Sequence, residues 1–151
     1  MDAFVQPLYE LADFDAIIRQ LKKPGSVQVS GCLDSQKAHF TNGLLREFPF
    51  RLIVAENDLK AKAFYEDFRL YDPEVLYYPA RDLIFYQADI HGNLLTRQRI
   101  QVLRALLERE EVTIVTSIDS CLDCLVPLAV WKEKVIKIRN DSEIDLDRMK
   151  R

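Results

Sequence analysis

The chain has 151 residues, of which 48% are hydrophobic and 30% charged, a balance typical of one globular domain that can bury a core. Its net charge of -3, with acidic and basic residues interspersed, argues against a domain whose main task is to neutralise nucleic-acid phosphates. No segment approaches the run of about 18 apolar residues expected of a membrane span, and the first residues lack a basic leader region. We therefore expect a soluble, cytoplasmic protein that does not bind a membrane.

Two hydrophobic patterns open the chain. Apolar residues at helical spacing predict an amphipathic helix, which the basic residues and breakers from Lys22 to Gly25 end. Its apolar positions are Leu11, Phe14, Ile17, Ile18 and Leu21. Val27 and Val29 then alternate with polar residues as in a short strand, and a second helix is expected from about Ser35 to Glu47.

The segment from Ser26 to Ala38 has the outline of a phosphate-binding loop. The working pattern is G-x-x-x-x-G-K-[ST] between a strand and a helix. Gly31 takes the first glycine position, and Lys37 takes the position of the phosphate-binding lysine. Two other parts are missing. Gln36 replaces the second glycine and would crowd the approach of the backbone to phosphate, and Ala38 replaces the hydroxyl that would ligate magnesium.

A third feature also opposes nucleotide binding. Asp34 places a negative charge in a loop that should attract phosphate, so only Lys37 favours a nucleotide. We therefore expect neither a functional cofactor site nor a catalytic residue here. From this segment alone, a chance match in an ordinary strand-to-helix turn stays open as the alternative.

The remaining chain alternates between strand and helix patterns. Strands are predicted at Arg51–Ala55, Val75–Tyr78, Val112–Thr116 and Val135–Ile138. The first of these is apolar enough to be buried on both faces. Asn57 is expected to cap a helix whose inward positions are Leu59, Ala63, Phe64, Phe68 and Tyr71. A loop from about Pro79 to Gly92 precedes a long helix from about Asn93 to Glu110.

This alternation predicts an α/β fold, a parallel sheet covered by helices on both faces. Ligands of such folds bind at the carboxyl ends of the strands. The Gly31 loop, the Glu56-Asn57 turn, the loop after Pro79 and the segment Ser117 to Asp123 should gather there.

The cysteines give a weaker signal. Cys121 and Cys124 have C-x-x-C spacing, but a structural zinc site needs four ligands and no second pair exists, so we expect no metal. A redox pair stays open as an alternative. We favour buried, apolar cysteines.

Several segments together resemble the N-terminal UvrB-homology module of bacterial transcription-repair coupling factor. They include GCLDSQKA, RLIVAENDLKA and RQRIQVLRALLEREEVTIVTSIDSCLDCLVP. The most specific part, Arg97 to Pro127, is similar to the corresponding helix and strand of UvrB itself. The family's degenerate phosphate loop maps onto Gly31, Ser35, Lys37 and Ala38, and this chain departs from it at Asp34, where most relatives have glycine.

The resemblance implies a P-loop, helicase-like fold, similar to the first domain of UvrB, without helicase activity. It also implies that residues 79–92 are too short for the DNA-clamping hairpin of UvrB, although Phe85 and Tyr86 remain, and we expect those two aromatics to pack under the loop. We assign residues 1–140 to a degenerate P-loop domain. Residues 141–151, whose Ser142 begins a capping-box-like pattern, would start an inserted, UvrA-binding-type domain, as expected of a fragment of a longer protein.

The function implied is that of a scaffold without catalysis. The parent protein would bind RNA polymerase and DNA and act as an ATP-dependent translocase in nucleotide excision repair, and UvrA would be recruited mainly through the inserted domain. Two alternatives stay open. One is an active P-loop nucleotide-binding or helicase-like enzyme domain, and the other is a general DNA-binding module.

Overall fold

The computed structural model describes residues 3–80 and 89–135. Residues 136–138 of the predicted last strand, the pair Phe85 and Tyr86, and the predicted domain start at residues 141–151 lie outside these ranges. None of the described helices combines the length and the apolar character that crossing a bilayer requires.

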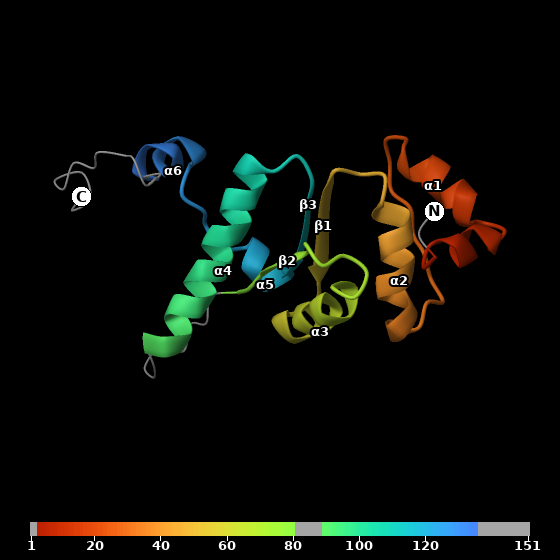
Figure 1. The fold of residues 1–151 in the computed structure, drawn as a ribbon, viewed down its shortest axis with the longest axis horizontal. Coiled ribbons are helices and arrows are strands. Elements are labelled where there is room, and N and C mark those ends of the chain that lie inside the picture. Colours follow the sequence, from red (N-terminus) through yellow and green to blue (C-terminus); the bar gives the residue numbers. More distant parts are fainter. Residues whose placement is uncertain (1–2, 81–88, 136–151) are drawn as a thin grey trace.

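A small parallel sheet forms the centre of the fold (Figure 1). Its three strands, β1 (Phe50–Ala55), β2 (Leu76–Tyr78) and β3 (Val112–Ser117), lie in the order β1-β3-β2. The middle strand is therefore the last in sequence, and Ile114 is in register with both Leu52 and Leu76. Every residue of β3 is buried. The prediction of an α/β fold with a parallel sheet is confirmed.

Helices cover the two faces of the sheet and define its two core clusters. On one face, α4 (Asp89–Glu108) packs its Val102 and Ala105 on β2 and β3. On the other face, α3 (Asp58–Phe68) packs Ala61 and Phe68 on β2 and β3. The alternation of side chains along β3 separates the clusters, because Val112 and Ile114 face α4 whereas Val115 faces α3.

The N-terminal helices form a third cluster beside this sheet. A short helix, η1 (Gln6–Glu10), and α1 (Phe14–Leu21) pack on α2 (Asp34–Leu45) through Leu8, Phe14, Ile18 and Leu44. In turn, α2 contacts α3 and places Ala38 in the core cluster on that face of the sheet, so α2 links the N-terminal helices to the sheet (Figure 1). Two short helices follow β3, namely α5 (Ile118–Cys121) and α6 (Leu128–Lys134).

The predicted strand at Val27 and Val29 is wrong. Residues 26–33 form no strand, and the side chain of Val29 is 42% exposed. A strand is stable only where a neighbour pairs with its backbone and burial holds its side chains. This segment joins α1 to α2, which pack on each other, and within the described ranges no strand pairs with it.

The prediction that the Arg51–Ala55 strand is buried on both faces is also wrong. Phe50, Leu52 and Val54 of β1 are 57%, 62% and 46% exposed, while the alternate residues are half-buried. Their register partners on β3 face α4, but that helix lies over β2 and β3. An apolar face of β1 therefore reaches the surface.

Two helix predictions need smaller corrections. Asn57 caps α3 as predicted, because its side-chain oxygen accepts a hydrogen bond of 2.9 Å from the amide of Lys60. Leu59, however, is 81% exposed, since the phase of α3 turns Ala61 and Phe68 toward the core. The long helix begins at Asp89, earlier than the predicted Asn93, and ends at Glu108.

We predict that Phe68→Ala lowers the free energy of unfolding by about 3–5 kcal/mol, because it empties a fully buried aromatic site. Leu59→Ala, on the exposed side of the same helix, should change it by less than about 0.5 kcal/mol. Urea unfolding followed by circular dichroism measures both. Equal losses for the two variants would contradict the assigned orientation of α3.

Candidate functional site

The segment predicted to be a degenerate phosphate loop leads directly into α2. Gly31 has a φ of +89°, a left-handed conformation that favours glycine, and the helix begins three residues later at Asp34. The strand that should precede such a loop is absent from the described part of the chain. The loop therefore does not extend from a strand of the sheet, as a working phosphate loop does.

Some of the backbone groups at the start of α2 are bonded within the loop itself. The carbonyl of Leu33 accepts hydrogen bonds from the amides of Gln36 (2.9 Å) and Lys37 (3.1 Å). The side-chain oxygen of Gln36 accepts the amide of Leu33 at 3.2 Å. Gln36, which replaces the second glycine, thus supplies one half of a capping box, since the side chain of Leu33 cannot return the bond.

The lysine of the loop is paired as well. Lys37 Nζ lies 2.6 Å from Asp34 Oδ1, one helical turn away. The hydrogen bond and the positive charge of Lys37 hold the pKa of Asp34 below its usual value, and the charge of Lys60 on α3 adds to this shift. Asp34 in turn raises the pKa of Lys37, so both groups are charged at neutral pH. The cation that would attract phosphate is therefore paired with a carboxylate at the exposed start of the helix.

The position of the missing metal-ligating hydroxyl is part of the core. Ala38 is 1% exposed and packs in the same cluster as Ala61 of α3 and Val115 of β3. Ser35, by contrast, is exposed. The structure therefore brings together Asp34, Gln36 and Lys37 at the helix start and turns Ala38 away from them into the protein.

The carboxyl ends of the strands, where ligands of this fold class bind, are joined by the protein's own polar side chains. Asp58 Oδ1 accepts the amide of Ala80 at 3.1 Å and the hydroxyl of Ser117 at 3.4 Å. The Ser117 hydroxyl also accepts the amide of Ser120. As predicted, segments after all three strands meet at this edge, but they bond to one another.

A buried arginine reinforces the same edge. Arg99 of α4 is 7% exposed, and its Nη1 donates to the carbonyl of Pro79 at 2.7 Å. The same nitrogen lies 2.9 Å from Asp123 Oδ2, and the guanidinium stacks 4.2 Å from the centre of the Tyr78 ring. Arg99 therefore ties α4 both to the loop after β2 and to the segment after α5.

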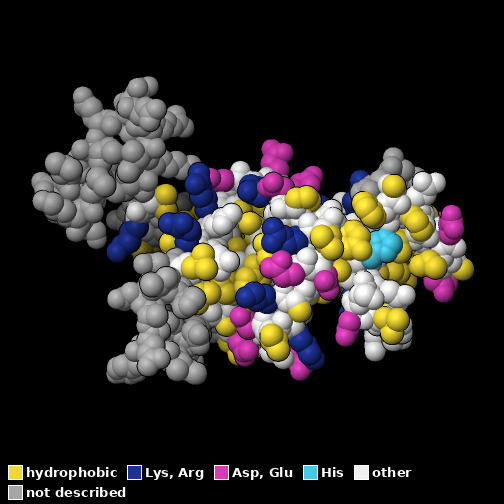
Figure 2. Space-filling view, turned by 60° about the horizontal axis from the view of Figure 1, so that its bottom comes forward, with side chains coloured by type: hydrophobic (Ala, Val, Ile, Leu, Met, Phe, Trp, Pro, Cys, Tyr) yellow, Lys and Arg dark blue, Asp and Glu magenta, His cyan; other side chains and the backbone are white. Residues whose placement is uncertain are grey.

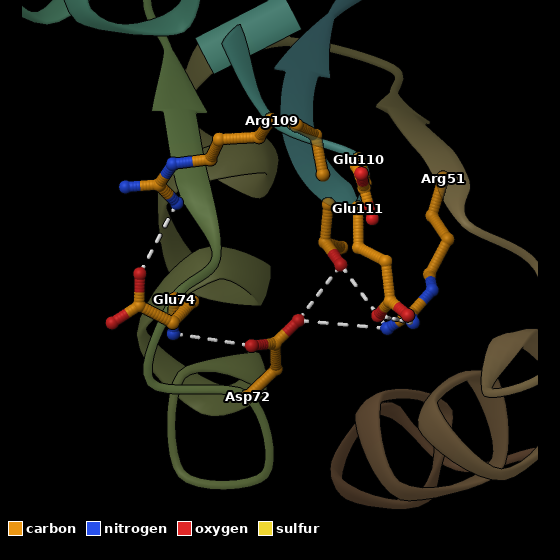
Figure 3. Close-up of a pocket in the computed structure, with 8 residues that line it drawn as sticks. Arg51, Asp72, Glu74, Arg109, Glu110 and Glu111 are labelled. Atoms are coloured by element: carbon orange, nitrogen blue, oxygen red, sulfur yellow. Dashed lines mark hydrogen bonds and ion pairs between the residues drawn. The ribbon is translucent and has the colours of Figure 1, made fainter.

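A cavity of about 540 Å³ lies at the opposite edge, where the strands begin (Figure 3). Arg51 of β1 donates to the carbonyl of Phe48 at 2.6 Å and lies 3.7 Å from Asp72 and 3.6 Å from Glu111. Thr113 of β3 also donates to Asp72 at 2.7 Å. These bonds tie the starts of the strands together, and each cation of the cavity already faces a carboxylate.

Sequence reasoning missed the residues that hold both edges together. Asp58 follows the capping Asn57, and Arg51 begins the predicted strand. Each was therefore counted as part of a helix or strand and not as a residue that joins distant segments. An arginine between the apolar positions of a helix, as Arg99 is, could have signalled a buried ion pair. Its partner, Asp123, is 24 residues away in the sequence, and no local pattern identifies it.

The cysteines differ from the prediction. Cys121 and Cys124 are both exposed, so the expected burial of this pair is wrong, while Cys32 is half-buried. Both cysteines lie in the short segment that ends α5 and follows it, where no core forms around them. Within residues 3–80 and 89–135, no group of three or more His, Cys, Asp or Glu side chains could hold a metal ion.

Comparison with known proteins gives one kind of relative. The chain is 25% identical over 125 residues to the transcription-repair-coupling factors of two Staphylococcus epidermidis strains, RP62A and ATCC 12228. The match covers 81% of this chain and 11% of each relative, so the chain spans about a tenth of their length. No protein-family profile matches the chain. The similarity supports a relationship to the transcription-repair coupling factors.

We predict that Lys37→Met raises the pKa of Asp34 back toward 3.8, its ordinary value, because it removes the main cause of the shift. The pKa of Asp34 is lowered by folding, so the pair contributes to stability above pH 3.8 and is lost as the pH falls through the lowered pKa. Carbon-13 NMR of the carboxyl groups measures this titration. Lys60→Met is the matched control and should raise the pKa less, and a larger effect of Lys60 would contradict the pairing.

We also predict that the chain neither binds nor hydrolyses magnesium-ATP at physiological concentration. The side chain of Gln36 caps the helix where a glycine is needed, Lys37 is paired with Asp34, and Ala38 is buried. Gln36→Gly with Ala38→Thr should not restore binding, because the first change removes the helix cap and the second puts a hydroxyl into the core. Isothermal titration calorimetry tests this, and a micromolar affinity for ATP would refute it.

Proposed function

We propose that this chain is a non-catalytic scaffold module of a transcription-repair coupling factor. In this proposal the module belongs to a longer, DNA-translocating protein that binds RNA polymerase and DNA, and it supports the recruitment of UvrA to stalled polymerase in nucleotide excision repair. UvrA binds mainly to the domain that follows residue 140. The module itself holds that domain in place and performs no chemistry.

The observation that carries the proposal is a loop in which Lys37 is paired with Asp34 and Gln36 caps the helix, in a chain similar to a coupling factor over 81% of its length. An active nucleotide enzyme would need an open lysine and free amides at the start of α2. Here Lys37 is paired with Asp34, and Leu33 accepts the amides of Gln36 and Lys37. Similarity to the relatives together with loss of the site favours a retained fold without catalysis.

The surface charge does not favour the alternative of a general DNA-binding module. Acidic and basic side chains lie beside one another over the middle of the face shown in Figure 2. Several of the described cations are held by carboxylates, among them Lys22, Lys60, Arg69, Arg104 and Arg109. A DNA-binding face would need cations that can neutralise phosphates.

The exposed face of β1 is consistent with a module that packs against other protein. Phe50, Leu52 and Val54 leave an apolar strip beside the part of the sheet that α4 covers. Strands of parallel sheets are normally buried on both faces. The relatives contain about nine times as much chain as this match covers, so further protein is available to cover the strip.

We predict that residues 1–151 fold alone but bind UvrA weakly or not at all, whereas a longer protein that extends through the following domain binds it clearly. The core clusters are self-contained, and the recognition surface is assigned to the following domain. Biosensor titrations of both proteins against immobilised UvrA, at low and moderate salt, measure the difference.

The control for this experiment is the fold of the shorter chain, which circular dichroism should show to be helical and cooperatively unfolding. Equal and tight UvrA binding by both proteins would place the recognition surface within residues 1–151 and refute this division of roles. If the difference in UvrA binding between the two proteins disappeared at moderate salt, the longer protein would bind through charge attraction alone, and this would also contradict the proposal.

A further inference from the structure

A groove of about 350 Å³ runs beside the outer edge of β2. One wall is Tyr65 of α3, and the other is formed by Gln98 and Gln101 of α4. The floor is the backbone of residues 73–77, which lead into and form most of β2. Among the strands in residues 3–80 and 89–135, β2 pairs with β3 alone, and its other edge faces this groove. An edge strand presents backbone N–H and C=O groups that an added strand can bind.

The open part of this edge is short and clearly bounded. Before β2, Asp72 accepts the amides of Val75 (3.2 Å, through its carbonyl) and Glu74 (3.1 Å, through its carboxylate). After β2, the carbonyl of Pro79 accepts Arg99, and the amide of Ala80 donates to Asp58. Side chains and turns therefore satisfy the backbone on both sides of β2. The available edge is the three-residue strand itself.

The chemistry of the walls matches a polypeptide backbone. A glutamine side chain carries an amide that both donates and accepts, like a peptide group. Neither Gln98 nor Gln101 has a side-chain partner among the residues that the structure describes. The charges at the groove cancel, because Arg109 Nη1 lies 3.1 Å from Glu74 Oε2 (Figure 3). A neutral site with open amides favours an uncharged ligand that can both donate and accept hydrogen bonds.

We propose that this groove binds an extended, uncharged segment of a partner protein, which adds to the sheet as a fourth strand beside β2. The segment's backbone would pair with the β2 edge, and its outward amides would bond to Gln98 and Gln101. Its side chains would alternate between the Tyr65 wall and the α4 wall. This inference depends on the β2 edge alone and holds whether or not the chain contributes to UvrA recruitment.

The probe is a terminally blocked hexapeptide of alternating threonine and valine, added to the nitrogen-15-labelled chain of residues 1–151. Saturable shifts are expected for the backbone amides of Leu76 and Tyr77 and for the side-chain amides of both glutamines. The same peptide with alternate backbone nitrogens methylated lacks the donors for the ladder and should bind at least tenfold more weakly. Equal binding of the methylated peptide, or shifts confined to β1, would overturn the proposal.

Variants of the glutamines give the second measurement. Gln98→Ala with Gln101→Ala should weaken peptide binding by about tenfold, as expected for the loss of two hydrogen bonds of ordinary strength. The matched control, Gln20→Ala with Gln28→Ala, changes two exposed glutamines away from the groove and should leave binding unchanged. No difference between the pairs of variants would overturn the proposal. Dimerisation of the chain through β2, seen by sedimentation, would also overturn it, because a second copy would then occupy the edge.

Discussion

The burial of the central strand is the constraint on which the rest of this structure depends. β3 pairs with β1 along one edge and with β2 along the other, and all of its residues are buried. Its alternate side chains hold α3 on one face and α4 on the other, so one strand organises both main core clusters. Its buried hydroxyl groups also form hydrogen bonds within the protein: that of Thr116 donates to the carbonyl of Tyr78 at 2.9 Å. A polar group in such a place costs stability unless it is bonded.

The same demand for bonded polar groups applies at the carboxyl edge of the sheet, where described side chains bond to the loops that follow the strands. In doubly wound folds this edge offers free amides and side chains to a nucleotide. Here Asp58, Ser117 and Arg99 satisfy the loop groups directly. The buried Arg99 pair with Asp123 requires its partners to stay in place, because a buried guanidinium that loses its carboxylate is strongly destabilising. Stability of this edge and nucleotide binding at it therefore compete for the same groups.

The uneven cover of the sheet follows from its small size and from the path of the chain. α4 lies over β2 and β3, which leaves the apolar face of β1 exposed, while the edge of β2 opens into a polar groove. The two edges of the sheet therefore differ in chemistry, and they suit different partners. The apolar strip on β1 favours a partner with a hydrophobic surface, because contact removes apolar area from water. The edge of β2 favours an extended peptide, whose backbone can form hydrogen bonds with the strand.

Local patterns in the sequence were sufficient for much of this structure. Helical spacing predicted α1, α2, α3 and α4 but not η1, α5 or α6, while alternation and apolar runs predicted β1, β2 and β3. Asn57 was identified as a cap because a capping side chain bonds an amide three residues on. The missing glycine at Gln36 and the missing hydroxyl at Ala38 could also be read directly from the sequence. These features depend on residues that are two to four positions apart, whose geometry the backbone itself sets.

Only the tertiary structure decided the features that depend on where distant segments meet. Val27 and Val29 alternate like a strand, yet no strand in the described part of the chain pairs with them. Leu52 is as apolar as a core residue, yet it is 62% exposed, because α4 lies over β2 and β3. Ser117 forms a hydrogen bond with Asp58, which is 59 positions earlier in the sequence. Arg99 forms an ion pair with Asp123, which follows α5. A hydrophobic pattern states that a side chain favours burial, but pairing and burial require a partner, and the path of the chain determines which partner is within reach.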